Sequence, residues 1–234
     1  MRFKDQTVMV TGAAGNLGQA LATAFAQQGA RLVLLGRQAD AIRTVFGAEG
    51  PDRLYLSTDL LDPQQVSAAL NTAVNRFGRV DVLCNLAGGF RMGQAVHQTE
   101  DSSWDFLVDI NVRTLLNMAR AVVPHMIECG GGKIVNVGAF AAQKGVAGMG
   151  AYCAAKSSVI RLTESMAAEL REKHINVNCV LPTTMDTPEN RAAMPDADPS
   201  RWVAPKDLAN VIVFLASPAA QAIHGVALPV TGLS

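Results

Sequence analysis

Aromatic residues are scarce, at 5% of the 234 residues, and neither sign of charge dominates, with 20 Lys and Arg against 20 Asp and Glu. This balance excludes a strong overall field that would draw the protein to nucleic acid or to a membrane surface. No apolar run reaches the roughly 20 residues that a helix needs to cross a bilayer. The opening residues, MRFKDQTVMV, lack the apolar core of a signal peptide. We expect a globular protein without a membrane or nucleic-acid partner.

Cysteine and histidine are also few, and neither is grouped. The four cysteines are far apart, with no Cys-x-x-Cys pair, and the four histidines show no metal-ligand spacing. Disulfides and a zinc site are therefore not expected. The pattern predicts free thiols in the reducing cytoplasm and no bound metal.

Short β-branched runs alternate with helical stretches along the whole chain. Strands are predicted at Thr7–Val10, Arg31–Leu35, Leu54–Ser57, Val80–Asn85, Lys133–Val137, Ile175–Leu181 and Val226–Val230. Apolar residues recur at helical spacing in Leu17–Gln28, Pro63–Phe77 and Ala154–Arg171. This alternation predicts an α/β fold: a Rossmann-type, doubly wound parallel sheet of about seven strands with helices on both faces. We expect residues 1–234 to form one domain, because no linker divides them.

The segment 182–205 is the exception to this regular alternation. It is rich in Pro, Asp and Met and shows no clear period. Loops after the carboxyl ends of strands line the ligand crevice in doubly wound folds, so we interpret the segment as a candidate substrate lid. The alternative is an ordinary long surface loop.

A glycine-rich turn follows the first predicted strand and precedes a helix. Gly12 permits a tight turn, small residues at 13–15 let a pyrophosphate approach the backbone, and Gly18 lets helix and strand pack closely. The helix N-terminus then offers free N–H groups to the phosphates. The turn therefore predicts dinucleotide binding, through Gly12, Gly15, Asn16, Leu17 and Gly18.

The end of the second strand bears on the choice of cofactor. An acidic residue there would hold the ribose hydroxyl of NAD, whereas an Arg suits the 2′-phosphate of NADP. The strand ends in Leu34-Leu35-Gly36-Arg37, without a carboxylate. We expect Arg37 to bind the phosphate and the cofactor to be NADP, with NAD possible if Arg37 is an ordinary surface arginine.

Tyr152 and Lys156 are spaced four residues apart, which places them on one helical face. A neighbouring ammonium favours the phenolate, so we expect Lys156 to lower the pKa of Tyr152. Tyr152 could then exchange a proton with a substrate while a hydride is transferred. The alternative is a pair of unrelated surface residues.

Together these motifs resemble the short-chain dehydrogenase/reductase family. The likeness includes the glycine-rich turn, Asp59-Leu60, Asn85-Leu86-Ala87-Gly88, Asn111 and the Tyr-x-x-x-Lys pair. The resemblance implies an NAD(P)-dependent oxidoreductase that acts on a small molecule. It implies an adenine contact at Asp59 and Leu60, and support of the adenosine side by Asn85, Ala87 and Gly88. Catalytic roles are implied for Tyr152, Lys156 and Asn111, the last through a proton-relay water, and nicotinamide contacts for Lys156, Pro182 and Thr187.

The family resemblance also predicts association. Its members commonly form tetramers through the helix of the Tyr-x-x-x-Lys pair, the preceding helix and the last strand. Leu228-Pro229-Val230 has the apolar character that such an interface needs. We expect a homo-oligomer, either a tetramer or a dimer.

Three positions depart from the family pattern. The usual Pro-Gly after the sixth strand is Pro182-Thr183 here. Most members have glycine where Asn16 stands, so Asn16 is expected either to contact a phosphate or to cap the helix. The family's catalytic serine lies 13 positions before the tyrosine, and this position is Ala139. A donor that would steady a developing oxyanion is therefore missing.

A narrower resemblance fits a serine-less site. The resemblance is to the quinonoid dihydropteridine reductases, and it lies in the stretches 87–89, 138–142, 148–152, 181–182, 186–191 and 194–198 and in Trp202. An electron-poor, conjugated substrate could accept hydride with a proton from Tyr152 alone. Two alternatives remain: a reductase of ordinary carbonyls in which water or Gln143 replaces the serine, and a dinucleotide-binding sensor or scaffold that has lost catalysis.

Overall fold

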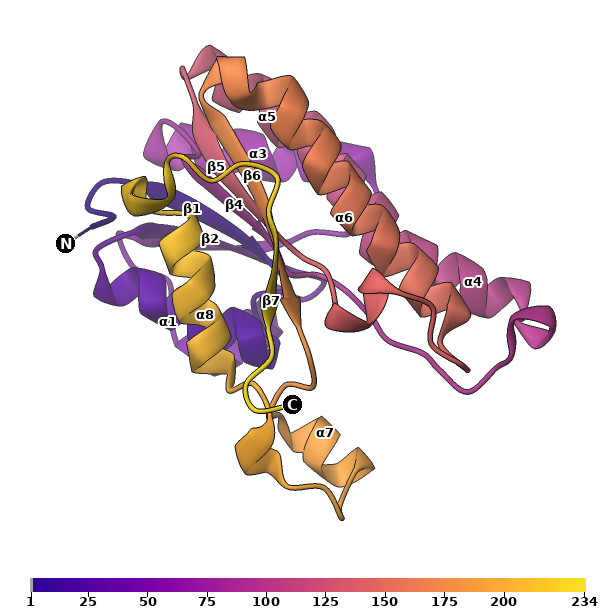
Figure 1. The fold of residues 1–234 in the computed structure, drawn as a ribbon. Coiled ribbons are helices and arrows are strands. Elements are labelled where there is room, and N and C mark those ends of the chain that lie inside the picture. The colour runs from indigo at the N-terminus through magenta and orange to yellow at the C-terminus, as the bar shows by residue number, and fades with distance from the viewer. Residues whose placement is uncertain (1) are drawn as a thin grey trace.

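One seven-stranded parallel sheet forms the centre of the computed structural model, which describes residues 2–234 (Figure 1). The strand order is β3-β2-β1-β4-β5-β6-β7, and every neighbouring pair is parallel. The strands are β1 Thr7–Thr11, β2 Arg31–Gly36, β3 Arg53–Ser57, β4 Val82–Asn85, β5 Gly132–Val137, β6 Ile175–Pro182 and β7 Ala227–Val230. This confirms the predicted Rossmann-type sheet. The order reverses between β1 and β4, which is where such folds bind their ligands.

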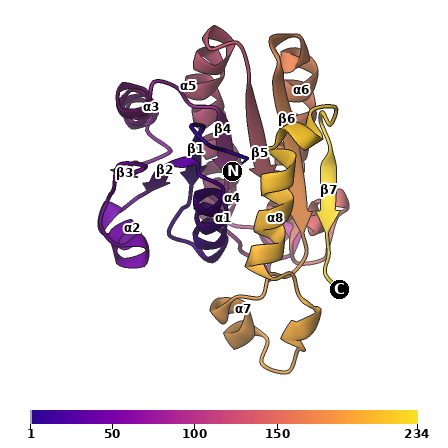
Figure 2. The ribbon, with the colours of Figure 1, turned by 90° about the vertical axis from the view of Figure 1, so that its left-hand side faces the viewer.

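Helices cover both faces of the sheet. They are α1 Asn16–Gln27, α2 Ala39–Phe46, α3 Pro63–Phe77, α4 Asp101–Val108, α5 Thr114–Glu128, α6 Gly150–Leu170, α7 Pro188–Ala193 and α8 Pro205–Leu215. A π-helical turn, Asp109–Arg113, joins α4 to α5. Figures 1 and 2 show α1 and α8 side by side on one face, with α3, α5 and α6 on the other.

The strands are apolar on both sides because each side faces a helix layer. In β1, Val8 and Val10 pack into the core beneath α1 and α8, while Met9 between them packs beneath α3 and α5. A third, smaller cluster near the carboxyl ends of β5 and β6 contains Ala139 and Leu181. The rigid sheet therefore fixes the loops that follow its strands.

The predicted elements agree with the structure to within one or two residues at most ends, but α6 begins at Gly150 rather than Ala154. Tyr152 therefore lies in the first turn of α6. Segment 182–205, which shows no period in sequence, contains α7 and a short helical turn at Pro199–Arg201. Both are too short for a visible apolar period, and each begins with a proline that follows a capping side chain.

This segment projects beyond the carboxyl ends of the strands (Figure 2) and is closed at its base. Met185 and Val203 form an isolated parallel bridge. The Asp186 N–H donates to the Val203 carbonyl at 2.9 Å, and the Val203 N–H donates to the Thr184 carbonyl at 2.9 Å. Backbone hydrogen bonds thus form a neck between β6 and α8.

Three further properties of residues 2–234 bear on membrane spans, metal sites and disulfides. No helix in this range is long and apolar enough to cross a membrane. No group of three or more His, Cys, Asp and Glu side chains in the same range is arranged to hold a metal ion. All four cysteines are free thiols.

Candidate active site

The turn between β1 and α1 leaves no room for a side chain at two of its glycines, Gly12 and Gly18. Gly12 has a φ of +65°, and a Cβ there would lie 3.1 Å from the Ala87 nitrogen. A Cβ at Gly18 would lie 2.5 Å from the Gly12 carbonyl oxygen. Gly15 is the N-cap of α1, and no side chain caps that helix end. The turn therefore presents bare backbone and free N–H groups, which is what a pyrophosphate requires.

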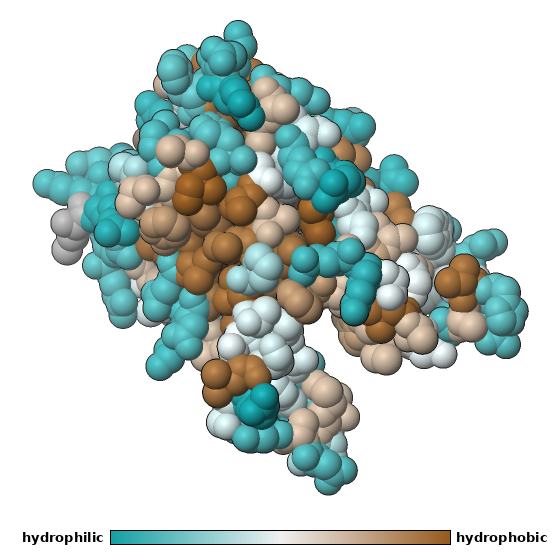
Figure 3. All heavy atoms as spheres, viewed as in Figure 1, coloured by the Kyte–Doolittle hydropathy of each residue, from teal (hydrophilic) through white to brown (hydrophobic). Residues whose placement is uncertain are grey.

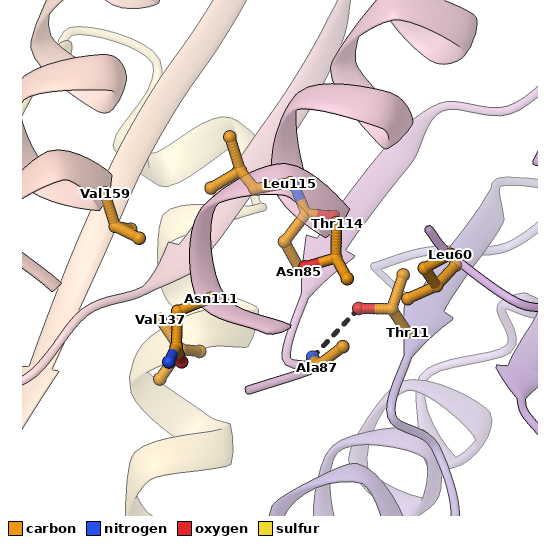
Figure 4. Close-up of a pocket in the computed structure, with 9 residues that line it drawn as sticks. All are labelled: Thr11, Leu60, Asn85, Ala87, Asn111, Thr114, Leu115, Val137 and Val159. Carbon is orange, nitrogen blue, oxygen red and sulfur yellow. Dashed lines mark hydrogen bonds between the residues drawn. The ribbon is translucent and has the colours of Figure 1, made fainter. Parts of the chain in front are cut away.

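A second loop is tied to this turn. The Thr11 Oγ1 atom accepts hydrogen bonds from the Leu86 and Ala87 N–H groups, both at 3.0 Å. Figure 4 shows the Thr11–Ala87 contact between the ends of β1 and β4. The two loops on either side of the topological switch point are thus held as one surface.

Asn16 does not cap α1, so that part of the sequence interpretation is wrong. It is the first residue of the helix, after the N-cap Gly15. Its side-chain amide instead donates a 2.9 Å hydrogen bond to the carboxylate of Glu189 in α7. Leu17, also expected at the cofactor, has its side chain in the core, so only its backbone is available to a ligand.

The residues expected on the adenosine side lie at the ends of β2 and β3. Arg37 is exposed directly after β2, and its carbonyl accepts a 2.8 Å hydrogen bond from the Ser57 hydroxyl. Asp59 is exposed, and its Oδ1 accepts from the Leu61 N–H at 2.9 Å. Leu60 is buried, and its carbonyl accepts from the Asn117 amide at 2.9 Å. These contacts fix the backbone and leave the Arg37 guanidinium available to a phosphate.

Lys156 is buried one helical turn after Tyr152, on the same face of α6. Its ammonium donates a 2.9 Å hydrogen bond to the Val137 carbonyl at the end of β5. Burial lowers the pKa of Lys156 to about 8 and raises the pKa of Tyr152 to about 12. The expectation that Lys156 lowers the tyrosine pKa is therefore wrong for this structure, because burial raises this pKa and Lys156 is not among the groups that shift it.

Asn111, in the π-helical turn, uses its side chain to hold the loop after β4. Its Oδ1 accepts from the Gly89 N–H at 3.1 Å, and its Nδ2 donates to the Gly89 carbonyl at 3.0 Å and to the Leu107 carbonyl at 2.9 Å. A Cβ at Gly88 would lie 2.9 Å from Asn111 Oδ1 and 3.1 Å from Lys156 Nζ. Gly88, Asn111 and Lys156 thus converge at one point.

A small cavity of about 10 Å³ lies behind this point, bounded by polar and apolar side chains (Figure 4). Asn85 lines it, and the Asn85 Oδ1 has no hydrogen-bond partner among the described residues. The Asn85 Nδ2 donates to Asn136 Oδ1 at 2.9 Å, and Asn136 Nδ2 donates to Thr163 Oγ1 at 2.9 Å. Asn85 therefore links β4 to β5 and, through Thr163, to α6.

Ala139 is only 6% exposed and packs in the apolar cluster with Leu181. No hydroxyl stands at this position, and a Cβ on Gly138 would meet Leu181 at 2.6 Å. Gln143 does not fill the gap. It lines an outer groove with Ala154 and Ser157, which lie on the α6 surface away from Tyr152 and Lys156.

The nicotinamide contacts expected at the end of β6 lie at the start of the projecting segment. Pro182 is the buried last residue of β6. Thr187 is the N-cap of α7, and its hydroxyl oxygen accepts from the Asn190 N–H at 3.2 Å. Sequence reasoning missed two residues here: Glu189, on Asn16, and Phe90, whose ring contacts Tyr152. Neither contact has a local signal, because the partners are far apart in the chain.

Comparison with known proteins decides the family. The family model for short chain dehydrogenases matches residues 6–198. The chain belongs to this family. It is therefore an NAD(P)-dependent oxidoreductase of the short-chain dehydrogenase/reductase type.

Relatives cover nearly the whole chain. A D-threitol dehydrogenase of Mycolicibacterium smegmatis is 33% identical and aligns over 99% of this chain and 93% of its own. A 3-oxoacyl-[acyl-carrier-protein] reductase of Thermotoga maritima is 31% identical over 99% and 98%. The narrower resemblance to dihydropteridine reductases is not tested by these relatives and stays a prediction.

Solved structures agree closely with the fold. A 3-ketoacyl-(acyl-carrier-protein) reductase from Brucella melitensis, complexed with NADH, has a TM-score of 0.88 and 32% identity, and covers 98% of both chains. A carveol dehydrogenase from Mycobacterium avium, in complex with NAD, has a TM-score of 0.85 and 27% identity, and covers 98% of this chain and 97% of its own.

Proposed function

We propose that this protein transfers a hydride between NADP(H) and a small carbonyl, quinonoid or pteridine-like substrate, with Tyr152 as the acid/base. The observation that carries the proposal is the placement of Tyr152 and Lys156 on one face of α6. Gly88 and Asn111 meet Lys156 there, while Ala139 stands where the family has serine.

The residues present fit a dinucleotide. The glycine turn at 12–18 and the uncapped α1 end would hold the pyrophosphate, and Arg37 the 2′-phosphate. Asp59 and Leu60 would contact the adenine, while Asn85, Ala87 and Gly88 would support the adenosine side. Lys156, Pro182 and Thr187 would hold the nicotinamide end. When bound, the nicotinamide supplies or accepts the hydride.

Tyr152 is suited to proton donation. With a pKa of about 12, its phenol keeps its proton at neutral pH. In reduction, the phenol O–H would give this proton to the substrate heteroatom while the adjacent carbon receives the hydride. Lys156, whose pKa is about 8, would carry positive charge at neutral pH and stabilise the phenolate that remains.

The missing hydroxyl at Ala139 bears on the substrate. A simple ketone concentrates negative charge on one oxygen during hydride transfer, and a donor aimed at that oxygen is a large part of catalysis. A quinonoid or pteridine ring spreads this charge over several atoms. We therefore favour an activated, conjugated substrate over an ordinary carbonyl.

The segment 182–205 is our candidate substrate lid, within one oxidoreductase domain at 1–234. It follows β6 at the carboxyl edge of the sheet, and Figure 3 shows it as a projection set apart from the lobe that contains α4. Glu189 brings it to the phosphate turn through Asn16 at 2.9 Å. A lid in this position would cover both cofactor and substrate.

We also infer that the chain acts in the cytoplasm as a homo-oligomer, a tetramer or a dimer. Four free thiols favour a reducing compartment. Apolar side chains gather over α8 and β7 (Figure 3), including Phe214, which is 40% exposed. Sedimentation velocity that shows only monomer at micromolar concentration would overturn the inferred assembly.

The test is NADPH oxidation by the purified protein with quinonoid dihydropterin, simple quinones and simple ketones. We expect turnover of a conjugated substrate. Tyr152→Phe should lower kcat by at least about 100-fold while NADPH binding stays unchanged. Tyr55→Phe, which changes the buried tyrosine of β3, is the matched control.

Turnover that survives Tyr152→Phe would exclude Tyr152 as the acid/base. Turnover of ketones alone would favour an ordinary carbonyl reductase in which Ala139 is compensated. NADPH binding without any turnover would favour the sensor or scaffold.

A further inference from the structure

Phe90 places an aromatic ring beside Tyr152. The two ring centroids are 4.8 Å apart and the planes meet at 89°, an edge-to-face contact. Phe90 is nevertheless 53% exposed. Phe90 is therefore about half open to solvent beside the ring of Tyr152, whose hydroxyl we assign to proton transfer.

The loop holds Phe90 there from both sides. The backbone of Gly89 is bonded in both directions to the Asn111 side chain. A Cβ at Gly89 would lie 2.9 Å from the Phe106 ring, so the loop presses directly against α4. Arg91, the residue after Phe90, contacts the same helix: its guanidinium lies 3.9 Å from the centroid of the Phe106 ring.

A further backbone contact fixes the loop against the start of α6. The Gly93 N–H donates to the Gly148 carbonyl at 2.8 Å, just before the turn that contains Tyr152. Figure 1 shows the segment between β4 and α4 beside the first turns of α6. The backbone around Phe90 is thus held in place, although Phe90 itself is about half exposed.

We propose that Phe90 is a specificity-determining residue, forming a wall on which a planar, conjugated substrate ring packs within reach of the Tyr152 hydroxyl. The inference rests on the proposed function and narrows its substrate class. Aromatic rings stack or meet edge to face with their centroids about 4.5–7 Å apart. Only part of the Phe90 surface contacts Tyr152, so the rest is available to a substrate ring. The methyl group of Ala139 adds no polar partner that would favour a saturated ketone.

A purely structural role for Phe90 predicts a different result from a role in substrate packing. If Phe90 only steadied Tyr152, its loss would slow every substrate equally. If Phe90 packs against the substrate, its loss would selectively weaken the binding of substrates with flat rings. The ratio of kcat/KM values for a flat and a saturated substrate therefore separates the two roles.

The experiment compares menadione, a flat quinone, with cyclohexanone, using NADPH and the complete protein. Phe90→Leu keeps apolar bulk but removes the ring. We expect the menadione-to-cyclohexanone ratio of kcat/KM to fall about three- to tenfold, mainly through KM for menadione. Phe90→Trp should keep or raise this ratio. The matched control is Phe46→Leu at the end of α2, a partly buried phenylalanine outside both the site and the apolar surface over α8 and β7.

An equal loss for both substrates, or no change in Phe90→Leu, would overturn the proposal. Where cyclohexanone turnover is undetectable, equilibrium dialysis of menadione against the NADP⁺-saturated protein replaces the ratio. There Phe90→Leu should raise the Kd at least threefold, and an unchanged Kd would overturn the proposal. Failure of the proposed function is distinct, because it would appear as menadione turnover that survives Tyr152→Phe.

Discussion

Ala139 shows how one methyl group constrains the chemistry of a site. It is buried in an apolar cluster against which Tyr152 packs, and its own side chain offers no hydrogen-bond donor. Gln143 lines a different surface. In our proposal, the substrate therefore stabilises its own developing charge.

Arg37 decides, in our proposal, between the two nicotinamide cofactors. Its guanidinium is exposed and forms none of the ion pairs found among residues 2–234. Arg37→Ala should raise the Kd for NADPH roughly 10- to 100-fold, the value of a lost charge-assisted hydrogen bond, and leave that for NADH nearly unchanged. Fluorescence titration with both cofactors measures this difference.

Arg43→Ala is the matched control, because that guanidinium already pairs with Asp40 and Glu49. Tighter binding of NADH than NADPH by the unaltered protein would contradict the assignment of Arg37.

At the scale of residues, the sequence predicts features that local steric constraints determine. It does not predict contacts between residues that are far apart in the chain. Gly12 and Gly18 are predictable because no side chain fits a tight turn against backbone. The pKa of Tyr152 is not, because it is set by burial that only the folded chain produces. The contact of Asn16 with Glu189 joins residues 173 positions apart, and no local pattern indicates it.

At the scale of elements, a side-chain hydrogen bond joins α7 to the start of α1. The Glu189 carboxylate lies 2.9 Å from the Asn16 amide, at the helix end where the pyrophosphate is expected. The Glu189 carboxylate and the pyrophosphate would then both lie at the positive end of the α1 dipole. We therefore expect the Glu189 carboxylate to oppose cofactor binding to a modest degree.

Glu189→Gln tests this opposition, because it removes the charge and keeps an oxygen that Asn16 can reach. We expect the Kd for NADPH to fall about two- to fivefold at low salt, with the difference fading at high salt. Glu128→Gln, at the exposed end of α5, controls for the loss of one charge elsewhere. An unchanged or weaker affinity in Glu189→Gln would contradict the expected repulsion.

Long elements are predictable and short ones are not. The bounds predicted for α3 match the structure, because 15 residues show a clear apolar period and Asp62 caps the first turn. The six residues of α7 span fewer than two turns, so no period could reveal it. The π-helical turn around Asn111 has no sequence signal that we can identify.

At the scale of the whole molecule, the buried Lys156 makes the free energy of unfolding depend on pH. Burial lowers the pKa of this lysine to about 8, so the folded protein disfavours its charge. Below pH 8 both folded and unfolded chains carry the proton, and the full cost of burying the charge is present. Between pH 8 and the ordinary lysine value of about 10.4 only the unfolded chain keeps the proton, so stability rises with pH.

Lys156→Met should remove this rise. The unfolding free energy of the parent should increase with pH relative to the variant, by up to about 1.4 kcal/mol per unit, between about pH 8 and 10. Urea unfolding of both proteins at several pH values measures it. Parallel pH profiles would show that Lys156 is not destabilised by burial.

The neck at Met185 and Val203 has a consequence for how such a protein can diversify. Because backbone hydrogen bonds join the two sides of the neck, residues 187–202 leave the sheet and return to it at nearly the same place. Insertions, deletions or wholesale replacement within this excursion leave the spacing of β6 and α8 unaltered. If this excursion is the substrate lid that we propose, a lineage could vary its length and sequence without rebuilding the sheet or the helix that carries Tyr152 and Lys156.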